Sequence, residues 1–254
     1  MTKKAFIHYL SLLLIFVPLQ NLAQDIAAQL KEARQLEAGF KDNEALQKYL
    51  HILSLDANNI TALCRASELY NSLGKRQPSK EKQKEYYNKS KVFAQKALNV
   101  NPNSSEANFV MALAMGRMAL ISSGQERINA VKEIKVFAER SVQLDSRNFK
   151  GYHLLGRWNF EVSDLSALEK WLVKLTYGAL PAASLQDAIR YYEKSAQLNP
   201  GFLLNYLELA KAYTRNEESK KAVSLLYAMM KLPSTSSEDA MIRSEGKKLL
   251  EKLR

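Results

Sequence analysis

Residues 151–200 read GYHLLGRWNFEVSDLSALEKWLVKLTYGALPAASLQDAIRYYEKSAQLNP, and this stretch decides the fold. Its first part places aromatic, large apolar and small residues at helical spacing, and its last part repeats that arrangement before a proline. Small residues let two helices approach closely, and proline cannot continue a helical hydrogen-bond ladder. The two parts are therefore predicted to be the paired helices of one repeat. The pattern is carried by Tyr152, Leu155, Gly156, Ala188, Tyr192, Ser195 and Pro200.

An insert over about residues 161–184 separates these two helices. Its apolar residues recur at spacings of three and four, which predicts an added helical segment that ends at the turn residues 177–181. Tryptophans in such helices belong to the core more often than to a ligand-binding surface. Trp158 and Trp171 are therefore predicted to fix the insert against its repeat. The insert's apolar residues are Leu165, Leu168, Trp171, Leu172 and Leu175.

The same pattern recurs along the chain with a register of about 34 residues, which is typical of tetratricopeptide repeats. The cleanest copy runs from Tyr206 to Pro233, and degenerate copies precede residue 151. Few glycines and prolines also favour helices joined by short turns, although Lys75 to Glu85 is predicted to be a long basic connection. We therefore predict an all-α, tetratricopeptide-like α-solenoid of helix pairs, with an expanded third repeat and a C-terminal capping helix.

The N-terminus has the pattern of an export signal. Lys3 and Lys4 precede an apolar run over residues 10–19, which is short for a membrane span. We expect a signal peptide over residues 1–23, a repeat domain over residues 25–254, and a periplasmic or secreted location. The alternative is an uncleaved segment that anchors the chain in the inner membrane.

The sequence contains no pattern typical of a catalytic, cofactor or metal site. His51 and His153 are the only histidines after the signal, and neither accompanies a zinc-binding motif. Glycine-rich phosphate loops and the G-x-S-x-G motif are absent from the sequence. The net charge of +11 suits acidic partners, but no nucleic-acid-binding motif is present. We predict a non-enzymatic protein without cofactor or metal that does not bind nucleic acid.

A basic track is the candidate binding site. In stacked helix pairs the first helix of each repeat lines the concave face, and its outward positions are rich in cations in the later repeats. Such a track suits a protein or peptide partner, including an acidic one. The alternatives are solvated surface charges or, for Arg157, an ion pair with Glu161 or Asp164. The proposed track consists of Arg117, Lys150, His153, Arg157, Lys211 and Arg215.

Three motifs add a family resemblance. The run LLGRW over residues 154–158, YGALP over 177–181 and LPSTSSED over 232–239 resemble the regulator of microtubule dynamics family, with this chain as an exported bacterial member. The resemblance implies a tetratricopeptide-like helical protein that binds partners and has no catalytic residues. The leading hypothesis is a protein-interaction scaffold. The alternatives are a microtubule-associated protein, or a membrane-associated protein held by its N-terminus or by the basic residues near Lys80.

Overall fold

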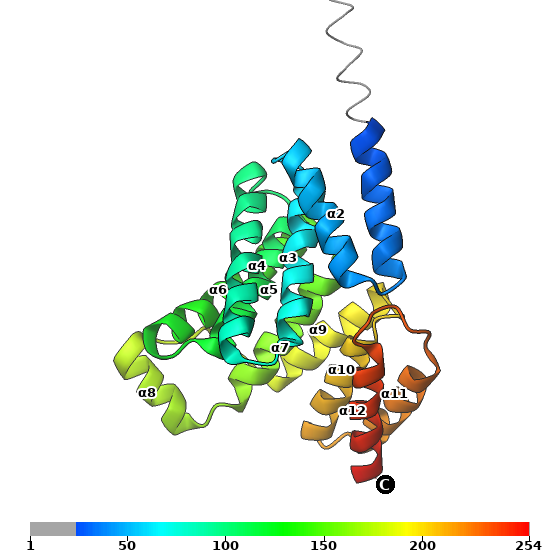
Figure 1. Cartoon of the computed structure of the whole chain (residues 1–254). Helices are drawn as coiled ribbons and strands as arrows, with labels where there is room; N and C mark the ends of the chain where they lie inside the picture. Colours follow the sequence, from blue (N-terminus) through cyan, green and yellow to red (C-terminus); the bar gives the residue numbers. More distant parts are fainter. Residues whose placement is uncertain (1–23, 254) are drawn as a thin grey trace, which may run out of the picture.

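A computed structural model describes residues 24–253, and all of its regular elements within that range are α-helices (Figure 1). The predicted signal peptide, residues 1–23, lies outside the described residues. A helix over residues 24–38 comes first. The helices that follow are α2 (Asp42–Leu55), α3 (Ile60–Lys75), α4 (Lys80–Val100), α5 (Ser105–Ile121), α6 (Gly124–Leu144), α7 (Phe149–Asp164), α8 (Ala167–Tyr177), α9 (Leu185–Leu198), α10 (Leu203–Arg215), α11 (Ser219–Lys231) and α12 (Asp239–Lys252).

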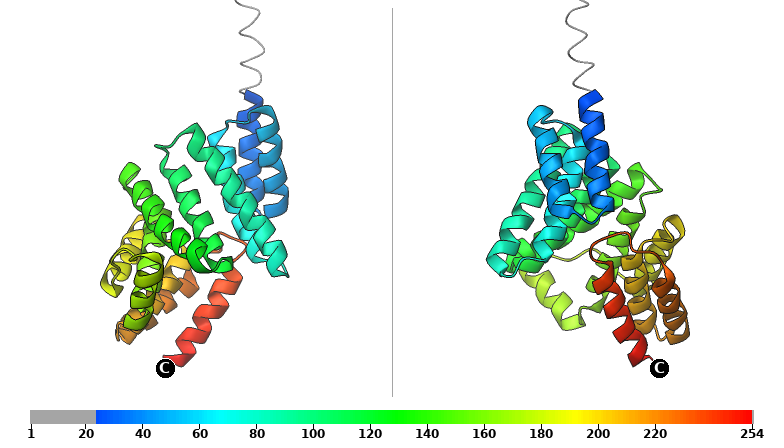
Figure 2. Two further views of the ribbon diagram at one scale, coloured as in Figure 1. Left: turned by 90° about the vertical axis from the view of Figure 1, so that its left-hand side faces the viewer. Right: turned by 45° about the vertical axis from the view of Figure 1, so that its right-hand side comes forward.

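The helices pack as successive pairs, α3 with α4, α5 with α6, α7 with α9 and α10 with α11. Each pair also packs on the next, so the chain forms a curved stack (Figures 1 and 2). The capping helix α12 packs against α10 and α11. The predicted all-α solenoid with an expanded third repeat is confirmed.

Small residues set the distance between paired helices, as the sequence predicts. A Cβ atom on Gly156 of α7 would lie 2.6 Å from the ring of Tyr192 on α9, and one on Gly74 of α3 would lie 2.7 Å from Tyr87 on α4. Neither distance allows a side chain. The glycines are therefore required for the close contact between a tyrosine of the second helix and the backbone of the first.

The insert differs from its prediction in one respect. Trp158 is buried and its Nε1 donates to the Val131 carbonyl at 2.7 Å, so its predicted core position is confirmed. The predicted core position of Trp171 is wrong, because 56% of this residue is exposed. The reason is that α8 packs mainly on α6 and lies at the edge of the molecule, where no second helix of residues 24–253 covers it (Figure 1).

The predicted long basic connection is also wrong. α3 ends at Lys75 and α4 already begins at Lys80, because the Ser79 side chain accepts a hydrogen bond from the Lys82 amide and caps the helix. Lys82 and Lys89 then pair with Glu85 at helical spacing. Lys80, Lys82 and Lys84 therefore belong to the first turns of α4. Within the described range, residues 24–253, we find no helix that is both long and apolar enough to span a bilayer.

Candidate binding cleft

A cleft lies on the inner side of the helical stack, and the first helices of the repeats line it. It has a volume of about 370 Å³. One wall is formed by α3, α5, α7 and the start of α10. The other is formed by residues 235–239, which lead from α11 into the first residue of α12. The side chains that matter below are Glu68, Arg117, Lys150, Arg157, Phe202 and Glu238.

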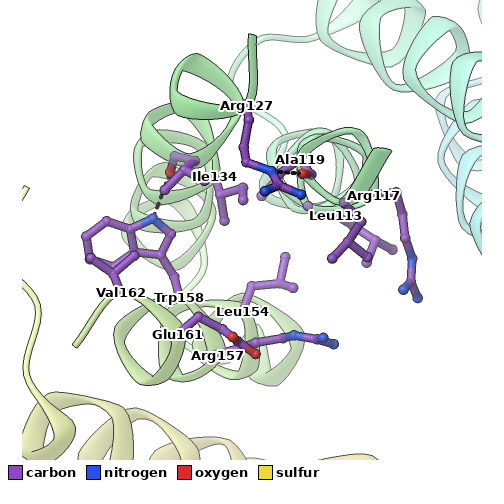
Figure 3. Close-up of a pocket in the computed structure, with 14 residues that line it drawn as sticks. Leu113, Arg117, Ala119, Arg127, Ile134, Leu154, Arg157, Trp158, Glu161 and Val162 are labelled. Carbon is purple, nitrogen blue, oxygen red and sulfur yellow. Dashed lines mark hydrogen bonds between the residues drawn. The ribbon is translucent and has the colours of Figure 1, made fainter. Parts of the chain in front are cut away.

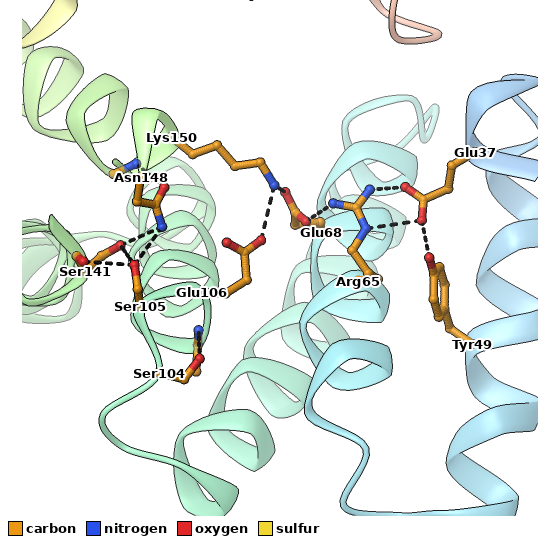
Figure 4. Close-up of polar contacts among 12 residues, drawn as sticks. Glu37, Tyr49, Arg65, Glu68, Ser104, Ser105, Glu106, Ser141, Asn148 and Lys150 are labelled. Carbon is orange, nitrogen blue, oxygen red and sulfur yellow. Dashed lines mark hydrogen bonds and ion pairs between the residues drawn. The ribbon is translucent and has the colours of Figure 1, made fainter. Parts of the chain in front are cut away.

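The N-terminal part of the cleft contains a row of balanced charges (Figure 4). Glu37 accepts hydrogen bonds from Tyr49 at 2.5 Å and from Arg65, which also pairs with Glu68. Lys150 then reaches from α7 to Glu68 at 2.7 Å. The row therefore links the first helix to the third repeat through alternating charges, and it leaves no free cation within itself.

Lys150 is consequently an ion-paired residue and not an open binding residue. Its second partner is Glu106, at 3.2 Å. Burial lowers the pKa of Lys150, but Glu68 and Glu106 outweigh burial and raise it. Burial raises the pKa of Glu68, but Lys150 and Arg65 outweigh burial and lower it. Burial and the charge of Glu68 raise the pKa of Glu106. Glu68 is therefore the ionised carboxylate that holds Lys150.

His153 does not face outward, which corrects its expected orientation. It is buried, its Nδ1 lies 3.0 Å from the Asn205 side-chain oxygen, and its ring packs edge-on against Phe202. Burial lowers its pKa to about 4, so the ring is neutral at pH 7. The side chain points toward α9 and α10, because α7 is packed between repeats at this position.

Lys211 and Arg215 make structural contacts in the last repeat. Lys211 bridges Glu208 and Glu245 at 2.8 Å each and so joins α10 to α12. Arg215 donates to the Phe160 carbonyl at 2.8 Å and pairs with Asp164 at 3.0 Å. Asp164, one of the two carboxylates considered for Arg157, is therefore paired with Arg215.

Arg117 and Arg157 differ from the other four predicted residues. Between residues 24 and 253, no carboxylate forms an ion pair with either guanidinium. The guanidinium of Arg117 lies 5.9 Å from the centre of the Tyr87 ring, and its buried Nε has no hydrogen-bond partner in the described part of the chain. Burial and the neighbouring charge of Arg157 lower the pKa of Arg117. Among the described residues these two cleft cations have no carboxylate within ion-pair distance, and Glu238 acts on Arg117 only through its longer-range charge.

A second, apolar pocket of about 250 Å³ adjoins the two arginines between α5, α6 and α7 (Figure 3). Its walls are mostly aliphatic and aromatic, and both arginines line this pocket as well as the cleft. Arg127 crosses the upper side of the pocket and donates to the Ala119 carbonyl at 2.9 Å. The arrangement combines three arginines and the Glu161 carboxylate with an apolar recess. Glu161, the other carboxylate considered for Arg157, forms no ion pair with Arg157 among the described residues. The apolar walls include Leu113, Ile134, Leu154, Trp158 and Val162.

Residues 235–239, called the C-terminal strap below, pack the segment before α12 against α2 and α3 (Figure 2). Glu238 accepts hydrogen bonds from Lys75 at 2.7 Å and from Ser72 at 3.0 Å, and Ser237 donates to Asp42 at 2.7 Å. Burial raises the pKa of Glu238, but Lys75 and Ser72 outweigh burial and lower it. The strap thus forms one wall of the cleft through contacts between residues more than 160 positions apart.

Within residues 24–253, the histidines, acidic residues and cysteine do not form a metal site or a reactive-thiol site. Across residues 24–253, no group of three or more His, Cys, Asp or Glu side chains is placed to hold a metal ion. Cys64 is buried on α3, as expected for a small apolar residue, and burial raises the pKa of its thiol. The cleft and its adjoining pocket remain the candidate site.

The helix pairs and the cleft define a tetratricopeptide-like helical-repeat protein. Among solved structures, the fold is similar to a thermophilic TPR protein from Thermus thermophilus, with a TM-score of 0.66 at 12% identity, covering 89% of this chain and 99% of that one. The Pseudomonas aeruginosa pilF protein is similar with a TM-score of 0.54 at 13% identity, covering 91% of this chain and 86% of that one. These similarities establish the fold alone.

The chain belongs to the family of regulator of microtubule dynamics proteins 1-3, whose model matches residues 29–254. Human regulator of microtubule dynamics protein 2 is 26% identical over 198 residues, covering 78% of this chain and 48% of the human one. The rat protein 3 is 25% identical over 89% of this chain and 49% of its own length, and the Caenorhabditis elegans protein 1 is 28% identical over 61% and 69%. The chain thus spans about half the length of these mammalian relatives.

Proposed function

We propose that the chain is a non-enzymatic interaction scaffold that binds a protein or peptide in the cleft, with Arg117 and Arg157 as its anchoring residues. The observation that carries this proposal is the pair of arginines without carboxylate partners beside an apolar pocket. Removing a cation from water without a counter-ion costs free energy, and a ligand carboxylate offsets that cost through charge-assisted hydrogen bonds. The favoured partner therefore carries an acidic group next to a large apolar side chain.

This proposal narrows the basic track from six residues to two. Four members of the track have partners inside the protein, so a ligand that used them would first have to break those contacts. Arg117 and Arg157 need no such rearrangement. The tetratricopeptide-like fold supports the same conclusion, because first helices of stacked pairs form extended binding surfaces.

The test uses a displayed library of short peptides. The wild-type chain is expected to enrich peptides with an acidic residue next to a large apolar one, and Arg117→Gln with Arg157→Gln is expected to lose that enrichment. Arg147→Gln, at a position where 86% of the side chain is exposed, is the matched control and should enrich the same peptides as the wild type. Equal enrichment by the double variant and the wild type would contradict the proposal.

A periplasmic or secreted location is proposed on the N-terminal pattern of residues 1–23. Mass spectrometry of the mature N-terminus tests it. A chain that begins at Gln24 or Asp25 supports export with cleavage, whereas a retained N-terminus supports the membrane-anchored alternative.

Microtubule association is the second candidate function, because the chain belongs to a family named for microtubule dynamics. Co-sedimentation of the purified chain with polymerised tubulin tests it directly. Sedimentation that depends on microtubules supports this function, and recovery of the chain in the supernatant at all tubulin concentrations argues against it.

A further inference from the structure

Helix α8 presents an apolar face that nothing in the described structure covers. None of its residues is buried. Leu168, Trp171, Leu172 and Leu175 are exposed to 65%, 56%, 47% and 69%, and their spacing places them on one side of the helix. These four residues are called the α8 apolar face. Contiguous exposed apolar residues of this size mark an interaction surface.

The α8 apolar face is exposed although the helix is firmly placed. Ser166 and Glu169 form a reciprocal capping box at the start of α8. Gly178 ends it with a φ of +78°, which glycine adopts without strain, and Lys132 of α6 donates to the Tyr177 carbonyl at 3.0 Å. Val173 and Tyr177 are half-buried on the side of the helix opposite the apolar face. The helix is therefore held at both ends, and its apolar face points away from the molecule.

The charged residues of α8 lie outside its apolar face. The Glu169 carboxylate accepts hydrogen bonds from the Ser166 amide and hydroxyl at 2.7 Å, and these bonds lower its pKa. Lys170 and Lys174 are exposed, and within the described residues neither forms an ion pair. Lys174 lies on a flank of the apolar face, whereas Lys170 lies on the far side of the helix. The Lys170 ammonium donates to the Ser163 carbonyl of α7 at 3.4 Å. Long lysine stems let the ammonium groups reach a polar surface while the apolar face is buried.

We propose that α8 docks on the surface of an anionic phospholipid membrane. The α8 apolar face enters the boundary between headgroups and acyl chains, where tryptophan and leucine are favoured, and Lys174 on its flank contacts the phosphate groups. The net charge of +11 attracts the whole chain to such a surface. This contact is distinct from the cleft and from the N-terminal segment.

Charge and size favour a membrane over a second copy of the chain. Two chains of strongly positive net charge repel each other. A helix of 11 residues also offers much less than the roughly 800 Å² that each partner contributes to a stable interface. An anionic bilayer has neither difficulty, because it supplies the opposite charge and needs only a shallow apolar insertion.

The two tryptophans of the chain make the proposal directly measurable. Trp158 is buried and Trp171 is exposed, so insertion of α8 changes the emission of Trp171 alone. The full chain is mixed with vesicles of equal parts phosphatidylcholine and phosphatidylglycerol whose acyl chains are brominated, because bromine quenches only tryptophans in contact with the bilayer. We expect a blue shift and quenching in the wild-type chain, and neither in Trp171→Phe.

Further variants test how binding occurs. Lys174→Ala should weaken quenching-based vesicle affinity about fivefold and Lys170→Ala much less, and added salt should weaken it in the wild type. Leu168→Ser with Leu172→Ser should abolish quenching. Val92→Ser removes an equally exposed apolar residue from α4 and should leave quenching unchanged. Circular dichroism checks that all variants keep their helices.

Three outcomes would overturn the proposal. The first is a chain that sediments with vesicles, for instance through its N-terminal segment, while Trp171 is not quenched. The second is a blue shift that appears without vesicles and grows with protein concentration, which would identify a second copy as the partner. The third is equal quenching by vesicles of phosphatidylcholine alone, which would contradict the role of Lys174 and of the positive net charge.

Discussion

The N-terminal end and the centre of the cleft differ in how their charged side chains are paired. At the N-terminal end, Lys150 pairs with two carboxylates within 3.2 Å, and Arg65 also pairs with two. At the centre, Arg117 and Arg157 have none among the described residues, and an apolar pocket adjoins them. Paired charges in a cleft hold the repeats in place, whereas unpaired charges remain available to a ligand. A cation's position on the inner face therefore does not by itself identify a binding residue.

Removing Glu68 should have the largest effect on stability. Glu68→Ala removes the contacts with Lys150 and Arg65. These two cations then keep only Glu106 and Glu37, respectively. Because a hydrogen bond to a charged group contributes about 1.5 kcal/mol or more, the loss of both contacts should cost about 3 kcal/mol of unfolding free energy. Denaturant unfolding measures it. Glu106→Gln is the matched control and should cost much less, because burial and Glu68 already disfavour the ionised form of Glu106 and raise its pKa. Equal losses for the two variants would show that Glu68 has no special place in the row.

The C-terminal strap should show an intermediate effect that depends on pH. Glu238 has a lowered pKa in the folded protein, so its contribution is present above the ordinary carboxyl pKa of 4.5 and is lost as the pH falls through the folded value. Glu238→Gln should remove about 2 kcal/mol of local stability near neutral pH, the usual contribution of a hydrogen bond to a charged group.

Hydrogen exchange of the strap and of α12, corrected for intrinsic rates, measures this effect. Faster exchange is expected in Glu238→Gln near neutral pH and in the wild type only at acid pH. Glu251→Gln, on an exposed position of α12, should exchange like the wild type. Unchanged exchange in Glu238→Gln would mean that the strap does not depend on its contacts with α3.

Replacing the unpaired arginines should have the smallest effect on stability and a large effect on binding. Arg117→Ala and Arg157→Ala remove charges that have no carboxylate to lose, so each should change the unfolding free energy by less than about 1 kcal/mol. Denaturant unfolding of each variant, side by side with Glu68→Ala, measures the contrast. A loss as large as that of Glu68→Ala would show that the arginines are structural.

The sequence predicts the fold well because its signal is local. Gly156 and Ala188 occupy positions where small residues permit close helix packing, and both contacts lie within one repeat. The site is predicted only in part because its charges pair over long distances. Lys150 finds Glu68 at a separation of 82 residues and Lys75 finds Glu238 at 163, and these partners depend on the curvature of the whole stack.

Trp171 illustrates the same limit. Its spacing with neighbouring leucines correctly predicts a helix with an apolar side. Whether another helix covers that side depends on where the insert lies relative to α6, which helical periodicity does not encode. The same spacing of apolar residues is therefore compatible with a buried core helix and with an exposed helix such as α8.

The most direct test of the account is where a bound peptide lies. A photoreactive residue replaces Leu113 in the apolar pocket or, as the control, Val92 on α4. With an acidic, apolar peptide selected from the library, the account predicts crosslinking at position 113 that disappears in Arg117→Gln with Arg157→Gln, and none at position 92. Equal crosslinking at the two positions, or crosslinking at 113 that survives loss of both arginines, would contradict it.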